Sequence, residues 1–391
     1  MSKFTNLSGQ LATISRLRAF RACARYHHLS YNERWESTGD DAETMAYGTC
    51  GHRVLEVWWG MLGSGATSDD TLAACVALID SDRKIRAALN PYQRASLTAV
   101  ITGYHLRWWE PSQAYEVLHV EAEFRAPLRN PMTGRPMRGW NEGGKIDVIV
   151  RDRADGRVYI IEHKFSGEDV SPGSSYWRRL RVDGQVSIYL DGARALGYEA
   201  AGAIYDVISR PGQKPCKATP PELREYTQGK GCKLCGGKVG VRGHGHRVVG
   251  GVETADPCPG CDDGWVEPPR LYAKQRATDE SPEEYRDRIA ASIAADPRGY
   301  YGRGDVVRFE DEAEGARIDV YETTLAIRAA LKTGRHPRNT DACTRLYGRT
   351  CPFLPVCSRE ATLDDSTLYR RRSSAHPELA TESPKELGQG V

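Results

Sequence analysis

Apolar side chains recur at helical spacing over the first third of the chain. Residues 12–38 combine such a pattern with a row of arginines on the other side, which predicts an amphipathic helix. Residues 43–62 continue with a second helix rich in Leu, Val and Trp, and residues 70–110 predict two more. The chain therefore begins with a mainly helical region.

Strand-like alternation replaces the helical pattern further on. The segments that alternate are 116–125, 145–151 and 157–164. The last two are joined at Arg153–Gly156, a sequence typical of a hairpin turn. A helix at about 183–197 and a short apolar strand at 201–208 follow. This order predicts an α/β fold with a mixed central sheet flanked by helices.

The composition changes after the last predicted strand and divides the chain. Residues 211–270 are rich in Gly, Pro, Cys and basic residues and poor in aliphatic ones, whereas 280–297 and 312–332 return to helical spacing. We predict four parts. They are an N-terminal helical and hairpin core (1–210), a cysteine-rich insertion (211–270), a C-terminal helical part (271–372) and a disordered tail (373–391).

Charge and cysteine content narrow the class of protein. The net charge of +2 provides no global positive field, so attraction to nucleic acid has to come from local patches. No apolar run is long enough for a membrane helix, and the first residues lack a secretory pattern, so we expect a cytoplasmic protein without a membrane partner. Eleven cysteines in a reducing compartment point to metal sites instead of disulfides.

The predicted hairpin carries the chemistry. Glu162 and Lys164 are two apart on one strand and share a face, and the turn at Arg153–Gly156 places Asp147 opposite Glu162. Cross-strand neighbours lie about 5 Å apart, close enough for two carboxylates to share Mg²⁺ or Mn²⁺. The lysine is suited to orienting a water molecule or stabilising negative charge. An ordinary amphipathic hairpin with solvated charges is the competing interpretation.

This hairpin and its flanks resemble the RecB-like branch of the PD-(D/E)XK nucleases. The resemblance implies a restriction-endonuclease-like core and a metal-binding role for His52, which precedes the hairpin on a predicted helix. It also implies an active-site helix with a Gln-x-x-x-Tyr motif, supplied here by Gln185 and Tyr189. The chain departs from the superfamily name in one way, because Ile146 stands where that name has proline.

Four cysteines near the two ends of the chain extend the resemblance. Iron–sulfur nucleases of the AddB and CRISPR-associated types place one cysteine in the N-terminal helix and three near the C-terminus, as Cys23, Cys343, Cys351 and Cys357 are placed here. The resemblance implies a 4Fe-4S cluster that ties the chain ends together, although four thiolates equally suit zinc. Seven residues separate Cys343 from Cys351, more than is common in the family.

The insertion contains a second set of cysteines. Two Cys-x-x-Cys pairs, Cys232 with Cys235 and Cys258 with Cys261, have the spacing of a zinc ribbon. A segment with so few apolar residues depends on metal for its fold, so we predict bound Zn²⁺. Its basic residues are compatible with a grip on DNA, and a structural or partner-binding role stays open.

A run of aromatic and basic residues separates the hairpin from the Gln185 helix. Tyr176, Trp177, Arg178, Arg179 and Arg181 are the predicted DNA contacts, because aromatic rings stack on bases and arginines bind phosphates.

Together these features predict a Mg²⁺- or Mn²⁺-dependent deoxyribonuclease, an exonuclease acting on DNA ends or single strands in recombination, repair or phage DNA processing. The chain has no P-loop, so unwinding would require a separate helicase or recombination protein as partner. Two alternatives remain: a non-catalytic nucleic-acid-binding module with a nuclease fold, and a protein whose zinc module binds RNA or another protein.

Overall fold

In the computed structural model, the helical pattern of the first hundred residues forms several separate helices. The structure describes residues 9–38, 41–226, 246–249, 252–257, 270–344, 350–376 and 379. By contacts the chain forms two compact units, one of Met1–Gly212 with Arg286–Val391 and the other of Gln213–Tyr285. The first unit contains the sheet and most of the helices.

The predicted helix over 12–38 is interrupted at Cys23. Helix α1 (Ile14–Ala22) ends where Cys23 takes an extended conformation, with φ −164° and ψ 120°. A short helix α2 (Ala24–His27), a π-helical turn η1 (His28–Asn32) and strand β2 (Trp35–Ser37) follow. The prediction of one continuous helix was therefore wrong, and Cys23 lies at a break instead of inside a helix.

The next helices match their predicted positions, with one extra break. Helix α3 covers Asp41–Gly63, and the segment 70–110 forms three helices instead of two: α4 (Ser68–Ser81), α5 (Arg83–Ala88) and α6 (Pro91–Ser112). The additional start arises at Asp82, whose side chain accepts the backbone N–H groups of Lys84 and Ile85.

A mixed sheet forms the centre of the first unit. Its strands are β1 (Gln10–Ala12), β3 (Tyr115–Arg129), β4 (Pro136–Asp152), β5 (Val158–Ser166), β6 (Ala200–Ser209) and β9 (Tyr301–Val306). The order is β3-β4-β5-β6-β9, with β1 on the same edge of β4 as β5. The β5–β6 and β1–β4 pairs are parallel and the others are antiparallel. The prediction of an α/β fold with a mixed sheet is confirmed.

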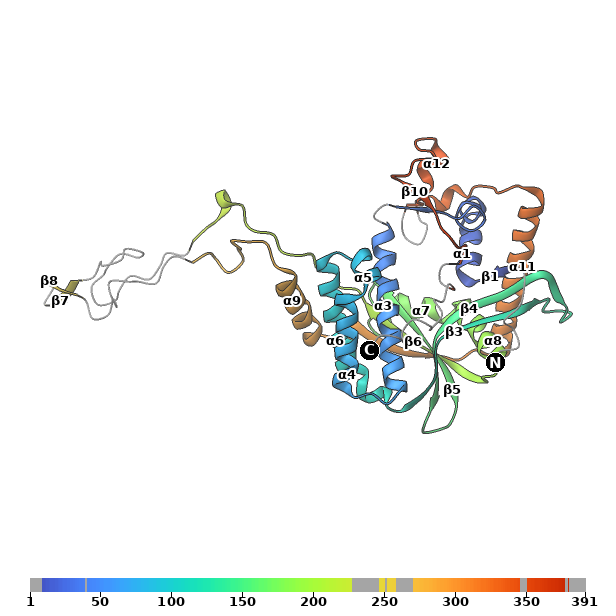
Figure 1. Cartoon of the computed structure of the whole chain (residues 1–391), viewed down its shortest axis with the longest axis horizontal. Helices are drawn as coiled ribbons and strands as arrows, with labels where there is room; N and C mark the ends of the chain where they lie inside the picture. Colours follow the sequence, from blue (N-terminus) through green and yellow to red (C-terminus); the bar gives the residue numbers. More distant parts are fainter. Residues whose placement is uncertain are drawn as a thin grey trace, which may run out of the picture. The chain divides into compact units, whose positions relative to one another are not determined.

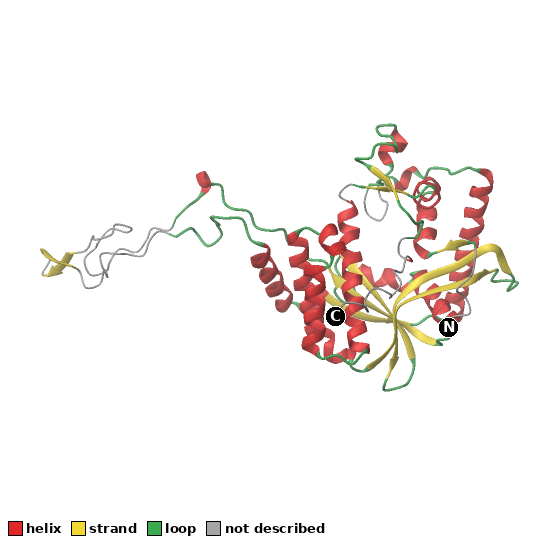
Figure 2. Cartoon of the chain, viewed as in Figure 1, coloured by secondary structure: helices red, strands yellow, loops and turns green. Residues whose placement is uncertain are grey.

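Helices cover both faces of this sheet. Helix α3 packs against β3, β4 and β5 and, with α4 and α6, forms a layer on one face (Figure 1). On the other face lie α8 (Gly184–Ala195) and α11 (Glu310–Thr333), which pack against each other, and α8 packs against four strands. Figure 2 shows the strands between these two helical layers. The central strand β5 is therefore buried on both faces.

The remaining elements complete the described part of the chain. They are α7 (Ser175–Arg181), η2 (Pro221–Leu223), β7 (His246–Val249), β8 (Val252–Pro257), α9 (Pro282–Ala295), α10 (Pro297–Tyr300), η3 (Thr340–Ala342), α12 (Leu354–Ser358) and β10 (Tyr369–Arg371). Strand β10 pairs antiparallel with β2, so the two end regions of the chain share a small sheet.

The second unit contains β7 and β8, which pair antiparallel. The four cysteines predicted to bind zinc, Cys232, Cys235, Cys258 and Cys261, lie outside the described residues. Of the helices in the described part of the chain, none combines the length and the apolar character that a membrane span requires.

The hairpin register places the predicted active-site residues opposite each other. The β4–β5 ladder runs from Arg151 paired with Val158 to Val148 paired with Ile161, so the next positions are Asp147 and Glu162. The register expected from the turn is confirmed. Beyond this point the β4 edge pairs with β1, through Trp140–Glu142. Asp147 therefore lies where β5 separates from β4, at an opening in the sheet.

Candidate active site

His52 reaches the opening in the sheet from helix α3. Its Nδ1 lies 3.3 Å from Oδ1 of Asp147, and its side chain is 34% exposed. The preceding residue, Gly51, allows this approach, because a Cβ there would collide with the ring of Phe165 on β5. The sequence Gly51-His52 thus lets the helix come close enough for the imidazole to meet the carboxylate.

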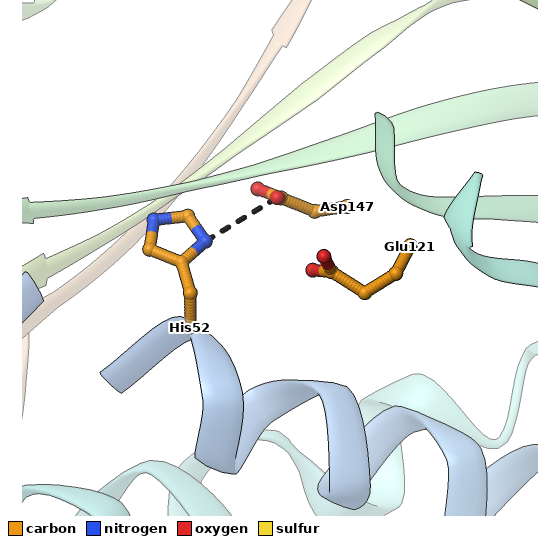
Figure 3. Close-up of side chains that lie close together, drawn as sticks. All are labelled: His52, Glu121 and Asp147. Atoms are coloured by element: carbon orange, nitrogen blue, oxygen red, sulfur yellow. Dashed lines mark ion pairs between the residues drawn. The ribbon is translucent and has the colours of Figure 1, made fainter. Parts of the chain in front are cut away.

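A third candidate ligand, Glu121, comes from strand β3. The β3–β4 ladder pairs Val120 with Val148 and Ala122 with Ile146, which places Glu121 next to Asp147. One ligand atom each from His52, Glu121 and Asp147 lie within 4.8 Å of one another. Figure 3 shows the three side chains converging, with the histidine on α3. This grouping has the composition of a site for a divalent cation.

Sequence reasoning did not identify Glu121. Glu121 lies in a predicted strand of alternating apolar and polar residues and belongs to no motif. Its backbone φ of 54° lies in the left-handed region, which is uncommon for a residue other than glycine. Such an exception, together with an ion pair to Lys145, marks Glu121 as a residue held in a special position.

Glu162 and Lys164 point toward helix α8 and form a closed set of contacts with Gln185. Lys164 Nζ lies 2.7 Å from Glu162 Oε1 and 2.8 Å from Gln185 Oε1. Gln185 Nε2 donates to the same Glu162 oxygen at 2.7 Å. Tyr189, one helical turn later, is buried and packs edge-on against Phe124. The structure thus brings Gln185 to the two hairpin residues, whereas Tyr189 lines the adjoining core.

Burial and the closeness of several carboxyl groups shift the pKa values in the site. Burial raises the pKa of Glu162 to about 7, and the charge of Asp147 adds to the rise. Burial and Asp147 also raise the pKa of Glu121. Burial opposes ionisation of Asp147 as well, but the His52 ring and the His163 amide outweigh burial and hold its pKa well below the usual range. Lys145, Lys164 and His52 contact these carboxyl groups, and a bound cation would stabilise their charged forms further.

One atom of the site fits a metal ion or a metal-bound water directly. Glu162 is 4% exposed, and among the described residues its Oε2 has no hydrogen-bond partner. A buried carboxylate oxygen rarely stays unpaired, because it loses the hydration that it had in water. Glu162 is not a member of the 4.8 Å group, but its carboxylate interacts electrostatically with two of the three residues, Asp147 and His52. The residues present therefore fit Mg²⁺ or Mn²⁺.

A buried polar network supports the site from the other face of β5. The His163 backbone N–H donates to Asp147 Oδ2 at 2.8 Å, and the His163 ring Nδ1 lies 3.3 Å from Asp206 Oδ2 on β6. The same Asp206 oxygen accepts from Tyr104 at 2.5 Å and Arg303 at 3.2 Å. Asp206 is fully buried. These contacts hold the His163 segment, and with it the Asp147 carboxylate, in one position.

The four terminal cysteines come together at a separate place. Cys23, Cys343, Cys351 and Cys357 line one small cavity, with Leu29 and Phe353 beside them. The Asn339 backbone N–H donates to Cys23 Sγ at 3.4 Å. All four are free thiols in this structure. The cavity brings together residues from both ends of the sequence.

The segment predicted to contact DNA divides into buried and exposed parts. Tyr176 is 7% exposed within the core. Trp177 is half-buried, donates to the Val170 carbonyl at 2.8 Å, and lies against Gly302 and Gly304 of β9. Both rings are therefore engaged in packing. The exposed residues of the segment are Arg178, Arg179 and Arg181.

Comparisons with known proteins address the fold and the class of enzyme. Residues 12–358 match the family model described as the PD-(D/E)XK nuclease superfamily. This chain belongs to the PD-(D/E)XK nuclease superfamily. No curated protein matches it. A solved structure entitled "Crystal structure of SSO0001" is similar at 14% identity and a TM-score of 0.24, over 53% of this chain and 66% of that one, just under two thirds of its length.

Membership of the PD-(D/E)XK nuclease superfamily gives the site its chemical meaning. The superfamily implies phosphodiester hydrolysis, binding of nucleic acid and use of a divalent metal. In this chain the candidate metal site is formed by His52, Glu121 and Asp147 together. The mixed sheet flanked by helices agrees with a restriction-endonuclease-like fold.

Proposed function

We propose that this chain is a Mg²⁺- or Mn²⁺-dependent deoxyribonuclease of the RecB-like branch, acting on DNA ends or single strands. The observation that supports it most is the convergence of His52, Glu121 and Asp147 within 4.8 Å, beside the unpaired oxygen of buried Glu162. When bound there, the metal would lower the pKa of the attacking water and neutralise charge on the phosphate.

The side chains around the metal site have different roles in the proposed reaction. Glu162, whose pKa is raised by burial, offers its free oxygen to the metal or to the attacking water. Lys164 is held 2.7 Å from Glu162 and 2.8 Å from Gln185, and its side chain is 22% exposed, so its ammonium faces both the site and solvent. It is placed to bind a phosphate oxygen as negative charge develops. Gln185 holds the Glu162 and Lys164 side chains in position through its hydrogen bonds to both.

Cleavage of labelled single-stranded and duplex DNA with Mn²⁺ tests this proposal. Asp147→Ala should lower the rate about a thousandfold or more, because a metal ligand is lost. Glu116→Ala is a matched control, since Glu116 is an exposed acid on β3 paired with Arg151. Wild-type protein that binds DNA without cutting it under any metal would overturn the proposal and favour a non-catalytic binding module.

We also propose a 4Fe-4S cluster in the cysteine cavity. Within the described part of the chain, no three of the four cysteine sulfurs all lie within 4.8 Å of one another. A single tetrahedral zinc ion would require sulfurs about 3.8 Å apart, given its short bonds to thiolate. One cysteine near the N-terminus and three near the C-terminus, as in the iron–sulfur nucleases that the sequence resembles, favour the iron–sulfide cluster. Anaerobic purification followed by iron and sulfide analysis tests this, and zinc without iron would refute it.

Two parts of the proposal rest on sequence alone. A structural zinc ion at Cys232, Cys235, Cys258 and Cys261 follows from their spacing, and metal analysis of Cys232→Ser with Cys235→Ser should show its loss. Participation in recombination, repair or phage DNA processing, with a separate helicase as partner, follows from the RecB-like resemblance and the absence of a P-loop from the sequence.

A further inference from the structure

A pocket lined by basic side chains lies where residues from the two end regions of the chain meet. Three arginines contribute to its lining, Arg16, Arg34 and Arg125, together with His376. Of the described residues that line it, none is an aspartate or a glutamate. Its volume is about 480 Å³, within the range of small-molecule sites. We name it the Arg16 pocket, and its charge is that of an anion site.

Arg16 is the buried member of this set. It is 2% exposed, and its guanidinium lies over the Trp140 ring at 5.0 Å. Its Nε donates to His27 at 3.1 Å, and one of its terminal nitrogens donates to the Leu11 carbonyl at 2.9 Å. Burial, together with the Arg16 charge, lowers the pKa of His27 to about 3, so both acceptors are uncharged. Among the described residues, Arg16 forms no ion pair with a carboxylate.

A buried guanidinium in these surroundings lacks a counter-charge. Burial lowers the pKa of Arg16 only to about 10, so the side chain keeps its charge at neutral pH. A charge that is removed from water is costly unless a group of opposite sign accompanies it. The guanidinium also has five N–H donors, more than the two acceptors named above can use. An anion in the pocket would supply both the charge and the acceptors.

The other two arginines are exposed and able to contact the same anion. Arg34 donates to the Ser373 carbonyl at 3.0 Å, and within the described part of the chain it forms no ion pair. Arg125 is paired with Glu123 at 3.2 Å, and its side chain is 43% exposed. An exposed pair of this kind contributes little, so Arg125 can exchange it for a phosphate oxygen. Arginine is well suited to that ligand, because its planar fork binds phosphate in a bidentate manner.

One face of the β3–β4 pair connects the Arg16 pocket with the candidate metal site. Arg125 contacts Glu123, and Lys145, the β4 residue opposite Glu123, contacts Glu121. These contacts place the four side chains on the same face. Glu121 and Arg125 are four residues apart, about 13 Å at the usual rise of a strand. About four nucleotides or fewer span that distance, because successive phosphates of one DNA strand are about 3.4 Å apart along the helix axis.

We propose that the Arg16 pocket binds a phosphate group of the DNA strand that is cut at the candidate metal site. Two sources offer the same chemistry: a terminal phosphate, and an internal phosphate of a DNA strand that continues past the pocket. The anion site itself follows from the buried charge, whereas its assignment to the substrate rests on the proposed nuclease function. The pocket holds the DNA strand at a fixed distance from the metal and thereby determines where the strand is cut.

Inorganic phosphate tests the anion site without any cleavage. Potassium phosphate should raise the melting temperature above its value in potassium chloride of equal ionic strength, because phosphate binds the folded protein. The double variant Arg34→Ala with Arg125→Ala should lose at least about half of this increase. Arg83→Ala with Arg298→Ala is the matched control, because it removes two exposed arginines that do not line the pocket. The control should respond to phosphate as the parent does.

Binding of single-stranded oligonucleotides tests the substrate in an Asp147→Ala background. The pocket double variant should bind about tenfold more weakly, and the log–log slope of affinity against salt should fall by about 0.7, as expected for one phosphate contact. Oligonucleotides with a 5′-phosphate, a 3′-phosphate or only hydroxyl ends identify the source. Weaker binding of one phosphorylated form alone supports a terminal phosphate, whereas equal weakening of all three supports an internal one.

Equal phosphate response, affinity and slope in the pocket double variant and its control would overturn the proposal. A loss of phosphate response without any loss of DNA affinity would overturn the assignment to the substrate. Arg16→Gln removes the buried charge and should abolish the phosphate response. If that variant does not fold, the comparison of the two double variants still decides. A wild-type protein that binds DNA through the pocket but cleaves nothing refutes the nuclease function alone.

Discussion

The carboxylate site and the cysteine cavity draw on different parts of the chain. His52, Glu121 and Asp147 come from a long helix and two paired strands at the centre of the sheet. Three of the cavity cysteines come from short or irregular segments near the C-terminus, and Cys23 comes from a helix break near the N-terminus. The first site is held by the sheet and its covering helices, whereas the second brings together chain ends with a small core of their own.

This difference predicts different consequences of metal loss. The carboxylate site keeps its geometry through backbone pairing and the Asp206 network, so removing its metal should abolish activity with little change in folding. The cavity has few such supports, so a cluster bound there stabilises the chain ends by its binding free energy. Four variants, taken from the largest expected effect to the smallest, test this contrast.

Glu121→Gln should have the largest effect, on activity. Loss of one carboxylate ligand should raise the Mn²⁺ concentration required for half-maximal cleavage by about 10–100-fold. Excess metal should restore much of the rate, and the melting temperature should stay close to that of the parent. Glu123→Gln, two residues along the same strand and paired with Arg125, is the control. An unchanged metal requirement would remove Glu121 from the site.

Cys351→Ser should act mainly on stability. Cys351 lies in the cavity and in the small core formed with Leu29, Phe353 and Tyr369. We expect iron content to fall and Tm to drop by at least about 5 °C, as measured by calorimetry under anaerobic conditions. Cys216→Ser replaces an exposed cysteine and should change neither quantity. Equal iron content in the two variants would contradict a cluster in the cavity.

Tyr104→Phe weakens the network that holds the sheet side of the carboxylate site. The Tyr104 hydroxyl donates to Asp206 at 2.5 Å, and both residues are fully buried. Loss of a hydrogen bond to a charged group should lower the free energy of unfolding by about 2 kcal/mol, measurable by urea denaturation. Cleavage should slow only modestly, because Arg303 still contacts Asp206. A stability equal to that of the parent would show that the network does not support the site.

Glu142→Gln should have the smallest effect on cleavage, and its effect on stability depends on pH. Glu142 lies on β4 where β1 pairs, five residues before Asp147. Burial, with Asp191 nearby, raises its pKa from 4.5 to about 8. Between these values the folded protein retains a proton that the unfolded chain has lost, so stability falls as pH rises. Relative to the parent, the variant should therefore gain about 1.4 kcal/mol of stability for each pH unit between about pH 5 and pH 8, and nothing below about pH 4. A pH-independent difference would contradict this assignment.

Much of the sheet could be predicted because its strands are consecutive and their turn is explicit. Alternation and the Arg153–Gly156 turn were enough to place Asp147 opposite Glu162. Strand β9 (Tyr301–Val306) was missed, because it is short, contains two glycines and has no apolar alternation. The break at Cys23 was missed for a related reason. Apolar residues continue at helical spacing on both sides of Cys23. The break is accompanied by contacts with residues 337–339, which are far away in the sequence.

The sequence by itself determined the local part of this protein. Periodicity and turn residues specified the hairpin and the helix that carries Gln185, because these depend on neighbours in the chain. The resemblance to a known family pointed to His52 as a candidate metal ligand, and the hairpin pattern pointed to Asp147. The tertiary structure alone decided which other side chains meet them. Glu121 and Asp206 acquire their positions from strand pairing between distant segments. No periodicity records such long-range contacts, since they arise only when the sheet and its helices assemble.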